Sequence, residues 1–168
     1  MYECTLYSII DNLDPFVSFL EKNGWTKQRV NYSEKIYIGQ NFKLIIIPEK
    51  EDLIYKSSYD YNKNRQSICC GHMRYKVINM KEFLSEINNM NLTFKNEFKF
   101  NGYLLFKDQM TIELLIAEGE KYFAKFSSYH KSPVEGEKIL IIYAKYFMNY
   151  ASFIKPPLEW FNSDFHKN

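Results

Sequence analysis

The chain has 168 residues, a length that fits one domain or one domain with an appendage. Its 22 basic and 20 acidic residues nearly balance at a net charge of +2, which argues against a dedicated nucleic-acid-binding protein. Hydrophobic residues make up 46% of the chain, which excludes a disordered protein, and no apolar run approaches the roughly 18 residues that a membrane span needs.

The first 48 residues predict a strand, a helix and three further strands. Asp14 followed by Pro15 is typical of a helix start, and Gly24 is typical of a helix end. An apolar stripe that includes Phe16 fits the helix between them. We expect strands at 4–10, 25–32, 35–38 and 42–47.

The same order of elements repeats over residues 67–117. Asn79 with Glu82 forms a capping box for the second helix, and strands are expected at 67–78, 92–100, 103–106 and 110–117. The spacing from Phe16 to Phe83 is 67 residues (83 − 16). We therefore predict an α+β fold of two βαβββ modules, at about 1–48 and 67–117, joined by a polar linker loop at 49–66.

Two short motifs carry a resemblance to a known family. Residues 72–77 (HMRYKV) are a histidine-led strand that runs into a helix, and residues 106–114 (FKDQMTIEL) are similar to an FxDPxGxxxEL ending, with Gln109 in place of the proline. With the element order, they resemble the vicinal oxygen chelate superfamily of glyoxalase I, extradiol dioxygenases, and fosfomycin- and bleomycin-resistance proteins. The resemblance covers about residues 1–117 and implies a curved mixed β-sheet around a pocket.

Alternation along the strands places His72 and Glu113 on the face turned away from the helices. The resemblance implies that both occupy metal-ligand positions, for an ion such as Mn, Fe, Ni, Co or Zn. The matching positions of the first module are Thr5 and Ile45, and neither is a normal ligand, so the implied metal site is incomplete. The alternative is an ordinary hydrogen-bonded or solvated pair.

Further residues are candidates for binding a small-molecule ligand. Arg74 and Lys43 lean toward the same concave face and would attract an anion, or they simply extend to solvent at the rim of the sheet. Thr5 and Tyr7 of the first strand complete the predicted lining. We identify no catalytic residue.

Cys69 and Cys70 are predicted to be core or half-buried thiols. Cys69 and Cys70 lack C-x-x-C spacing, and adjacent strand residues point to opposite faces. An odd number of cysteines and the absence of a signal-like start lead us to expect a cytoplasmic protein.

Residues 118–168 are expected to be a helical extension. Tyr122, Phe123, Phe126 and Tyr129 suggest a short helix, and a capping box at Ser132–Glu135 opens a longer one that ends before Pro156. The aromatic stripe of the longer helix would pack on the sheet of the same chain or form an interface with a partner.

The sequence therefore favours a small-molecule-binding protein of the glyoxalase or bleomycin-resistance type, without a complete metal site or another cofactor. We expect a homodimer that binds neither nucleic acid nor membrane. Two alternatives stay open: a metal-dependent lyase, dioxygenase or transferase of the same superfamily, and a protein-binding module such as an inhibitor or immunity protein.

Overall fold

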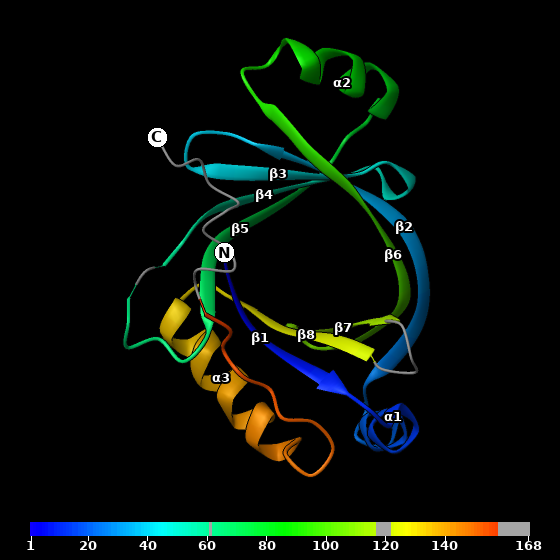
Figure 1. Ribbon diagram of the computed structural model, residues 1–168, viewed down its shortest axis with the longest axis vertical. Helices are drawn as coiled ribbons and strands as arrows, with labels where there is room; N and C mark the ends of the chain where they lie inside the picture. Colours follow the sequence, from blue (N-terminus) through cyan, green and yellow to red (C-terminus); the bar gives the residue numbers. More distant parts are fainter. Residues whose placement is uncertain (61, 117–121, 158–168) are drawn as a thin grey trace. The chain divides into compact units, whose positions relative to one another are not determined.

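The computed structural model describes residues 1–60, 62–116 and 122–157, which form an α+β fold (Figure 1). The described strands and helices are β1 (Tyr2–Ile10), α1 (Leu13–Lys22), β2 (Thr26–Ile38), β3 (Phe42–Ile47), β4 (Asp52–Tyr59), β5 (Ile68–Lys76), α2 (Met80–Glu86), β6 (Thr93–Lys107), β7 (Met110–Ile116), β8 (Tyr122–His130) and α3 (Pro133–Tyr146). Single turns of 3-10 helix lie at Pro48–Lys50 and Ile87–Asn89. None of the helices in these ranges combines the length and apolar character that a membrane-spanning helix needs.

Hydrogen bonds join the strands in the order β1-β5-β4-β3-β2-β6-β7-β8, and β8 pairs back with β1. Neighbours such as β3 and β4, or β7 and β8, run antiparallel. The α+β class expected from the sequence is confirmed. Its arrangement as two βαβββ modules stays a prediction.

The chain divides into two compact units that do not follow its linear order. The first unit contains Met1–Val30, Asp60–Cys69 and Asn101–Pro156, and the second contains Asn31–Tyr59 and Cys70–Phe100. Each unit draws residues from both predicted modules, and each is described by itself below.

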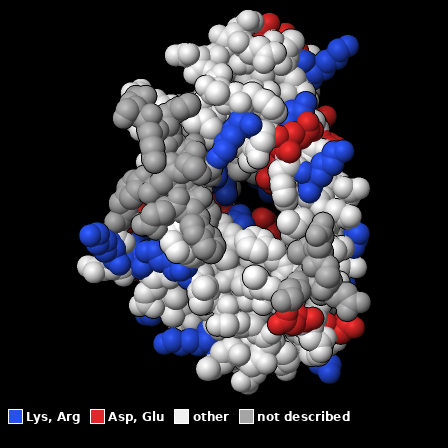
Figure 2. Space-filling model, in the orientation of Figure 1, with Lys and Arg blue, Asp and Glu red and all other residues white. Residues whose placement is uncertain are grey.

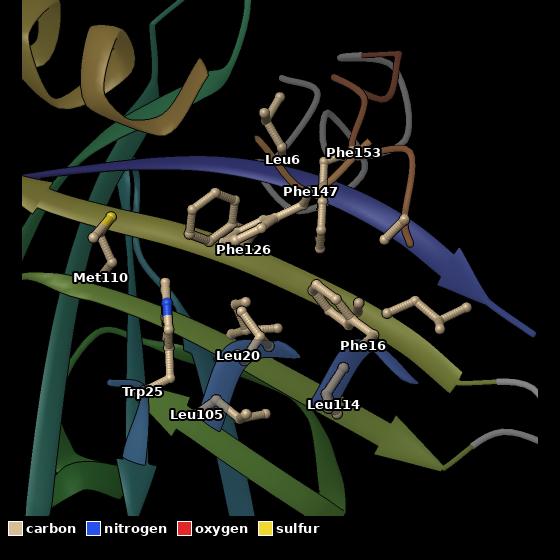
Figure 3. Packing of buried hydrophobic residues seen from close by; sticks show 14 of the residues in the cluster. Leu6, Phe16, Leu20, Trp25, Leu105, Met110, Leu114, Phe126, Phe147 and Phe153 are labelled. Carbon is tan, nitrogen blue, oxygen red and sulfur yellow. The ribbon is translucent and has the colours of Figure 1, made fainter. Parts of the chain in front are cut away.

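The core of the first unit lies between its strands and the helices α1 and α3. Phe16, Val17 and Leu20 of α1 are buried, as the apolar stripe of this helix predicts. Figure 3 shows Phe16 and Leu20 close to Phe126 of β8 and Phe147, which follows α3. The rings of Phe16 and Phe147 meet edge to face, with centroids 5.5 Å apart. This packing covers one face of β1, β7 and β8.

The core of the second unit is smaller and lies under α2. Asn79 caps this helix as predicted, since its side chain accepts a hydrogen bond from the backbone N–H of Glu82. Tyr37, Ile46 and Ile87 are its buried members, with Phe83 and Leu84 of α2 packed against them. One face of the strands β2, β3 and β4 is thereby covered.

The structure corrects three of the predicted loops and breaks. Residues 49–66 are not all linker, because β4 occupies Asp52–Tyr59; Asp52 and Lys56 are charged at buried positions and hide its alternation. Residues 26–38 form one strand, β2, and residues 93–107 form one strand, β6. Gly102 does not form a turn but lies inside β6. A Cβ at this position would stand 1.8 Å from the carbonyl oxygen of Leu114 on β7, so glycine is what permits the two strands to approach closely.

The C-terminal extension also differs from its prediction. Residues 122–130 form β8 and not a short helix, since Ala124, Phe126 and Ser128 alternate into the core beside β1 and β7. The helix α3 begins at the Ser132 cap and ends at Tyr146, well before Pro156. The chain after α3 then pairs with β1, where Tyr7 and Ile154 exchange backbone hydrogen bonds of 2.9 and 2.8 Å.

Candidate functional site

On the face drawn in Figure 2, basic and acidic side chains are interspersed. Charge on this face therefore gives no site, and the candidates come from the sheet faces that none of the described helices covers.

In the second unit, the sheet face opposite α2 carries a row of basic residues. Lys43 of β3 lies directly opposite Lys56 of β4, and Lys56 lies opposite His72 of β5. Directly opposed residues of antiparallel strands point to the same side of the sheet, so these three side chains share one face. We call Lys43, Lys56 and His72 the basic row.

Both lysines of the basic row are buried, at 9% exposure each. The ammonium group of Lys43 donates a hydrogen bond of 2.9 Å to the hydroxyl oxygen of Tyr59. Like charges directly opposite each other on paired strands are unfavourable. Burial strengthens the repulsion, because water no longer screens it. A negatively charged ligand would reverse this cost.

The electrostatic influence of the basic row extends to β6. Partial desolvation and the positive charge of Lys43 lower the pKa of Lys95. Lys95 therefore belongs to the same cationic neighbourhood.

The same sheet face also contains acidic residues. Asp52 of β4 is 1% exposed and forms ion pairs with Arg74 and, at 3.0 Å, with Lys76. Burial raises the pKa of Asp52, but the hydrogen bonds from Arg74 and Lys76 outweigh it, and the net pKa lies below the usual value. Glu34 of β2 alternates with Ile36 and Ile38 and so points to the same face. Basic residues outnumber acidic ones on this face.

In the first unit, the sheet face opposite α1 and α3 holds a lysine between two carboxylates. The Lys125 ammonium lies 2.9 Å from Glu3 Oε1 and 3.6 Å from Glu113 Oε1. Burial alone would lower the pKa of Lys125, but Glu113 and Glu3 outweigh it and raise the pKa well above its usual value. The two carboxylates therefore favour the charged form of Lys125.

Hydroxyl groups surround this ion cluster. The hydroxyls of Thr5 and Ser127 hydrogen-bond at 3.1 Å, and the hydroxyls of Ser127 and Tyr129 donate to Glu3 at 3.3 and 3.4 Å. Thr111 lies opposite Ser127, and within the described residues its buried hydroxyl has no hydrogen-bond partner. The cluster combines one lysine with two carboxylates, whereas the three side chains of the basic row are all basic.

The predicted site residues divide between the two units. Lys43, His72 and Arg74 lie on one face of the second unit, and Thr5, Tyr7 and Glu113 lie on one face of the first. His72 and Glu113, the implied metal ligands, thus belong to different units. Across residues 1–60, 62–116 and 122–157 there is no group of three or more His, Cys, Asp or Glu side chains able to hold a metal ion.

Sequence reasoning missed three residues of these faces. Lys56 was assigned to the linker, Lys125 to a short helix, and Glu3 was given no role. A signal was present for Glu3, because Glu3, Thr5 and Tyr7 alternate with Cys4 and Leu6, which are buried in the helix-covered core.

Comparisons with known proteins identify the fold. No protein-family model matches the chain, and no curated protein matches its sequence. A chain of the Mediator head module of Schizosaccharomyces pombe is similar in structure, with a TM-score of 0.70 and 11% identity over 93% of this chain and 99% of that one.

Two other solved structures are similar over nearly their whole length. A “putative adenylate cyclase” of Vibrio parahaemolyticus has a TM-score of 0.63 and 15% identity over 97% of this chain and 98% of that one. The protein PH1819 of Pyrococcus horikoshii has a TM-score of 0.62 and 13% identity over 96% and 98%. At these identities the likeness shows a shared fold.

Proposed function

We propose that this chain is a small-molecule-binding protein whose ligand is a phosphate-bearing anion held by the basic row of the second unit. The observation that carries the proposal is the direct opposition of Lys43 and Lys56, two lysines of neighbouring strands that are each only 9% exposed. An anion bound beside two opposed, buried ammonium groups would gain the attraction of both, which is why we assign the ligand to this place.

The chemistry of the row suits phosphate oxygens. Each lysine ammonium can donate three hydrogen bonds, and His72 adds a donor on the same face. Hydrogen bonds between charged partners are roughly twice as strong as neutral ones, and strongest where water is excluded. Arg74 is already paired with Asp52, so we assign it to the edge of the site.

One structural neighbour supports the choice of ligand class. The Vibrio protein carries the name “putative adenylate cyclase”, and an enzyme of that name acts on a phosphate-bearing nucleotide. Small-molecule binding was also predicted from the sequence. Here the ligand is assigned to the basic row and not to the pocket that the glyoxalase resemblance implies. The basic row needs only one unit, so it does not depend on the predicted pairing of two modules.

Isothermal titration calorimetry with inorganic triphosphate tests the proposal. Lys43→Gln and Lys56→Gln each remove one charged donor, and we expect each to weaken binding about ten- to hundredfold. Lys35→Gln is the matched control, because Lys35 lies on β2 opposite Ile46 and therefore on the face that α2 covers. We expect this control to bind like the wild type.

Two results would overturn the proposal. One is a wild-type protein that does not bind triphosphate at 50 mM salt, where screening of charge is weak. The other is an equal loss of affinity in Lys35→Gln and in the two row variants, with all three folded by circular dichroism. Either result would show that the row does not bind the anion.

A further inference from the structure

Two cysteine thiols meet in the first unit. Cys4 Sγ of β1 lies 3.6 Å from Cys69 Sγ of β5, and the two side chains are 0% and 1% exposed. Both cysteines are free thiols, and Cys4 Sγ also donates to the carbonyl oxygen of Pro133 at 3.4 Å. A disulfide has a sulfur–sulfur distance of about 2.05 Å, so an approach of about 1.5 Å would bring the two atoms to bonding distance.

The start of α3 closes over this pair. A Cβ on Gly136 would lie 3.2 Å from Cys4 Sγ, so glycine lets the helix backbone approach the thiol closely. Beside it, Glu137 of α3 accepts hydrogen bonds from the backbone N–H and the hydroxyl of Ser67, at 3.0 and 2.7 Å. These contacts fix the chain just before Cys69 and keep the two sulfur atoms adjacent.

The two thiols are not equivalent. The side-chain hydrogen bond with Cys69 lowers the pKa of Cys4 and outweighs burial, which raises it. The hydroxyl of Ser67 and the charge of Arg65 also lower this pKa, while the charge of Glu137 raises it. The hydrogen bond with Cys4 and burial raise the pKa of Cys69. These opposite shifts favour the thiolate form of Cys4 over that of Cys69, so we assign the nucleophilic thiol to Cys4.

We propose that Cys4 and Cys69 are a reversible redox pair that forms an intramolecular disulfide when the protein meets a hydroperoxide. The Cys4 thiolate attacks the peroxide, one oxygen is transferred to give a sulfenic acid, and the second oxygen leaves as hydroxide or alkoxide. The Cys69 thiol then attacks the Cys4 sulfur, the sulfur–sulfur bond forms, and the sulfenic oxygen leaves as water. The two thiols lose two electrons in total, and the peroxide gains them.

The burial of the two thiols limits which oxidants can reach them, and the position of Cys69 beside Cys4 determines which thiol completes the disulfide. A small, neutral hydroperoxide can reach the pair through local opening, whereas a bulky disulfide such as oxidised glutathione requires far more of the unit to open. Cys70 is the internal control: it follows Cys69 directly on β5 and lies opposite Tyr59 of β4, so its side chain points to the other face of the sheet. It should take no part.

The disulfide should also change stability. It would join residues 65 positions apart in the chain, and closing so long a loop restricts the unfolded state strongly. For a protein of this length we expect the melting temperature to rise by about 5–15 °C. Reduction with dithiothreitol should return it to the starting value.

Mass spectrometry of the full chain provides the test. The native protein is treated with hydrogen peroxide, unfolded in N-ethylmaleimide and digested with trypsin without reduction. We expect a loss of 2 Da from the intact mass before alkylation. After alkylation and digestion we expect a link between the Cys4 peptide and the peptide of residues 66–74, with fragmentation assigning the bond to Cys69 and the maleimide to Cys70. A main product linked through Cys70, a link between chains, or three alkylated cysteines would overturn the proposal.

Variants sharpen this result, and the wild-type peptide map is decisive even if one of them fails to fold. Cys70→Ser should still lose 2 Da, whereas Cys69→Ser should instead gain one or more oxygen atoms at Cys4. A 2 Da loss in Cys69→Ser, or its absence in a folded Cys70→Ser, would contradict the assignment of the pair.

Discussion

Replacing Lys125 by methionine tests the ion cluster of the first unit. Methionine keeps most of the chain volume and removes the charge that lies 2.9 Å from Glu3 and 3.6 Å from Glu113. Glu3 is only 2% exposed, so the variant leaves a carboxylate in a position that water barely reaches. The change therefore measures how much free energy of unfolding is lost when the buried carboxylate of Glu3 no longer has its lysine partner.

We expect Lys125→Met to lower the free energy of unfolding by about 3 kcal/mol. Removing one partner of a buried ion pair costs about 3–5 kcal/mol, and two hydroxyl donors remain on Glu3, which places the loss at the lower end. Adding Glu3→Gln removes the stranded charge. The double variant should therefore lose at least about 1 kcal/mol less than the sum of the two single losses.

Urea unfolding at pH 7 measures these quantities from the midpoint and slope. Lys27→Met is the control, because Lys27 pairs with Glu21 at 3.9 Å while both side chains are 37% and 48% exposed. An exposed pair of this kind, with a nearby tyrosine ring, is worth less than about 1 kcal/mol. The reasoning fails if Lys125→Met costs no more than Lys27→Met, or if the losses of Glu3→Gln and Lys125→Met simply add.

Three further predictions concern other parts of the fold. The pKa of Asp52 in the folded protein lies below the usual 3.8, so its ion pairs stabilise the protein above about pH 4, and this contribution is lost as the pH falls through the folded pKa. Asp52→Asn should therefore lower the urea midpoint at pH 7 and flatten the decline of that midpoint toward pH 3. A decline as steep as that of the wild type would contradict this. Ser132→Ala removes the hydroxyl that caps α3 and should cost about 1 kcal/mol, seen as a melting temperature lower by about 2–4 °C; no shift would show that the cap is not used. Gly102→Ala places a methyl group against the Leu114 carbonyl and should cost at least 1–3 kcal/mol in urea unfolding, by roughly the cost of overpacking, and a neutral result would mean that β6 and β7 do not approach as closely as the structure has them.

The elements that could be predicted are those whose pattern has one physical meaning. The apolar stripe of α1 and the caps at Asn79 and Ser132 identify helices directly, since backbone N–H groups at a helix start need such acceptors. In β5, alternation separates His72, Arg74 and Lys76 from Met73 and Tyr75, and the registers confirm it. Alternation does not predict burial here, because Met73 and Tyr75 are apolar and yet 44% and 51% exposed.

The elements that were missed carry charged residues at buried positions. Asp52 and Lys56 interrupt the apolar alternation of β4, so the segment was interpreted as a linker, although pairing with β3 and β5 holds it as a strand. In β8, the aromatic residues of 122–129 fit a helical spacing as well as a strand, and only the pairing with β1 and β7 decides between them.

The candidate site could be predicted in part for the same reason. Lys43, His72 and Arg74 were assigned to a common face by alternation along their own strands. Lys56 could not be assigned to this face in the same way. Its place depends on which strands pair with β4, and its cross-strand partners Lys43 and His72 belong to β3 and β5. Charged residues in a segment taken for a loop give no sign that they are buried.

A crystal structure of the protein grown with a saturating concentration of inorganic triphosphate tests the proposed function most directly. We predict phosphate density within hydrogen-bonding distance of the ammonium groups of both Lys43 and Lys56, the two buried lysines that face each other across β3 and β4. Density for triphosphate at other residues only, with the basic row in contact with protein and water alone, would contradict it.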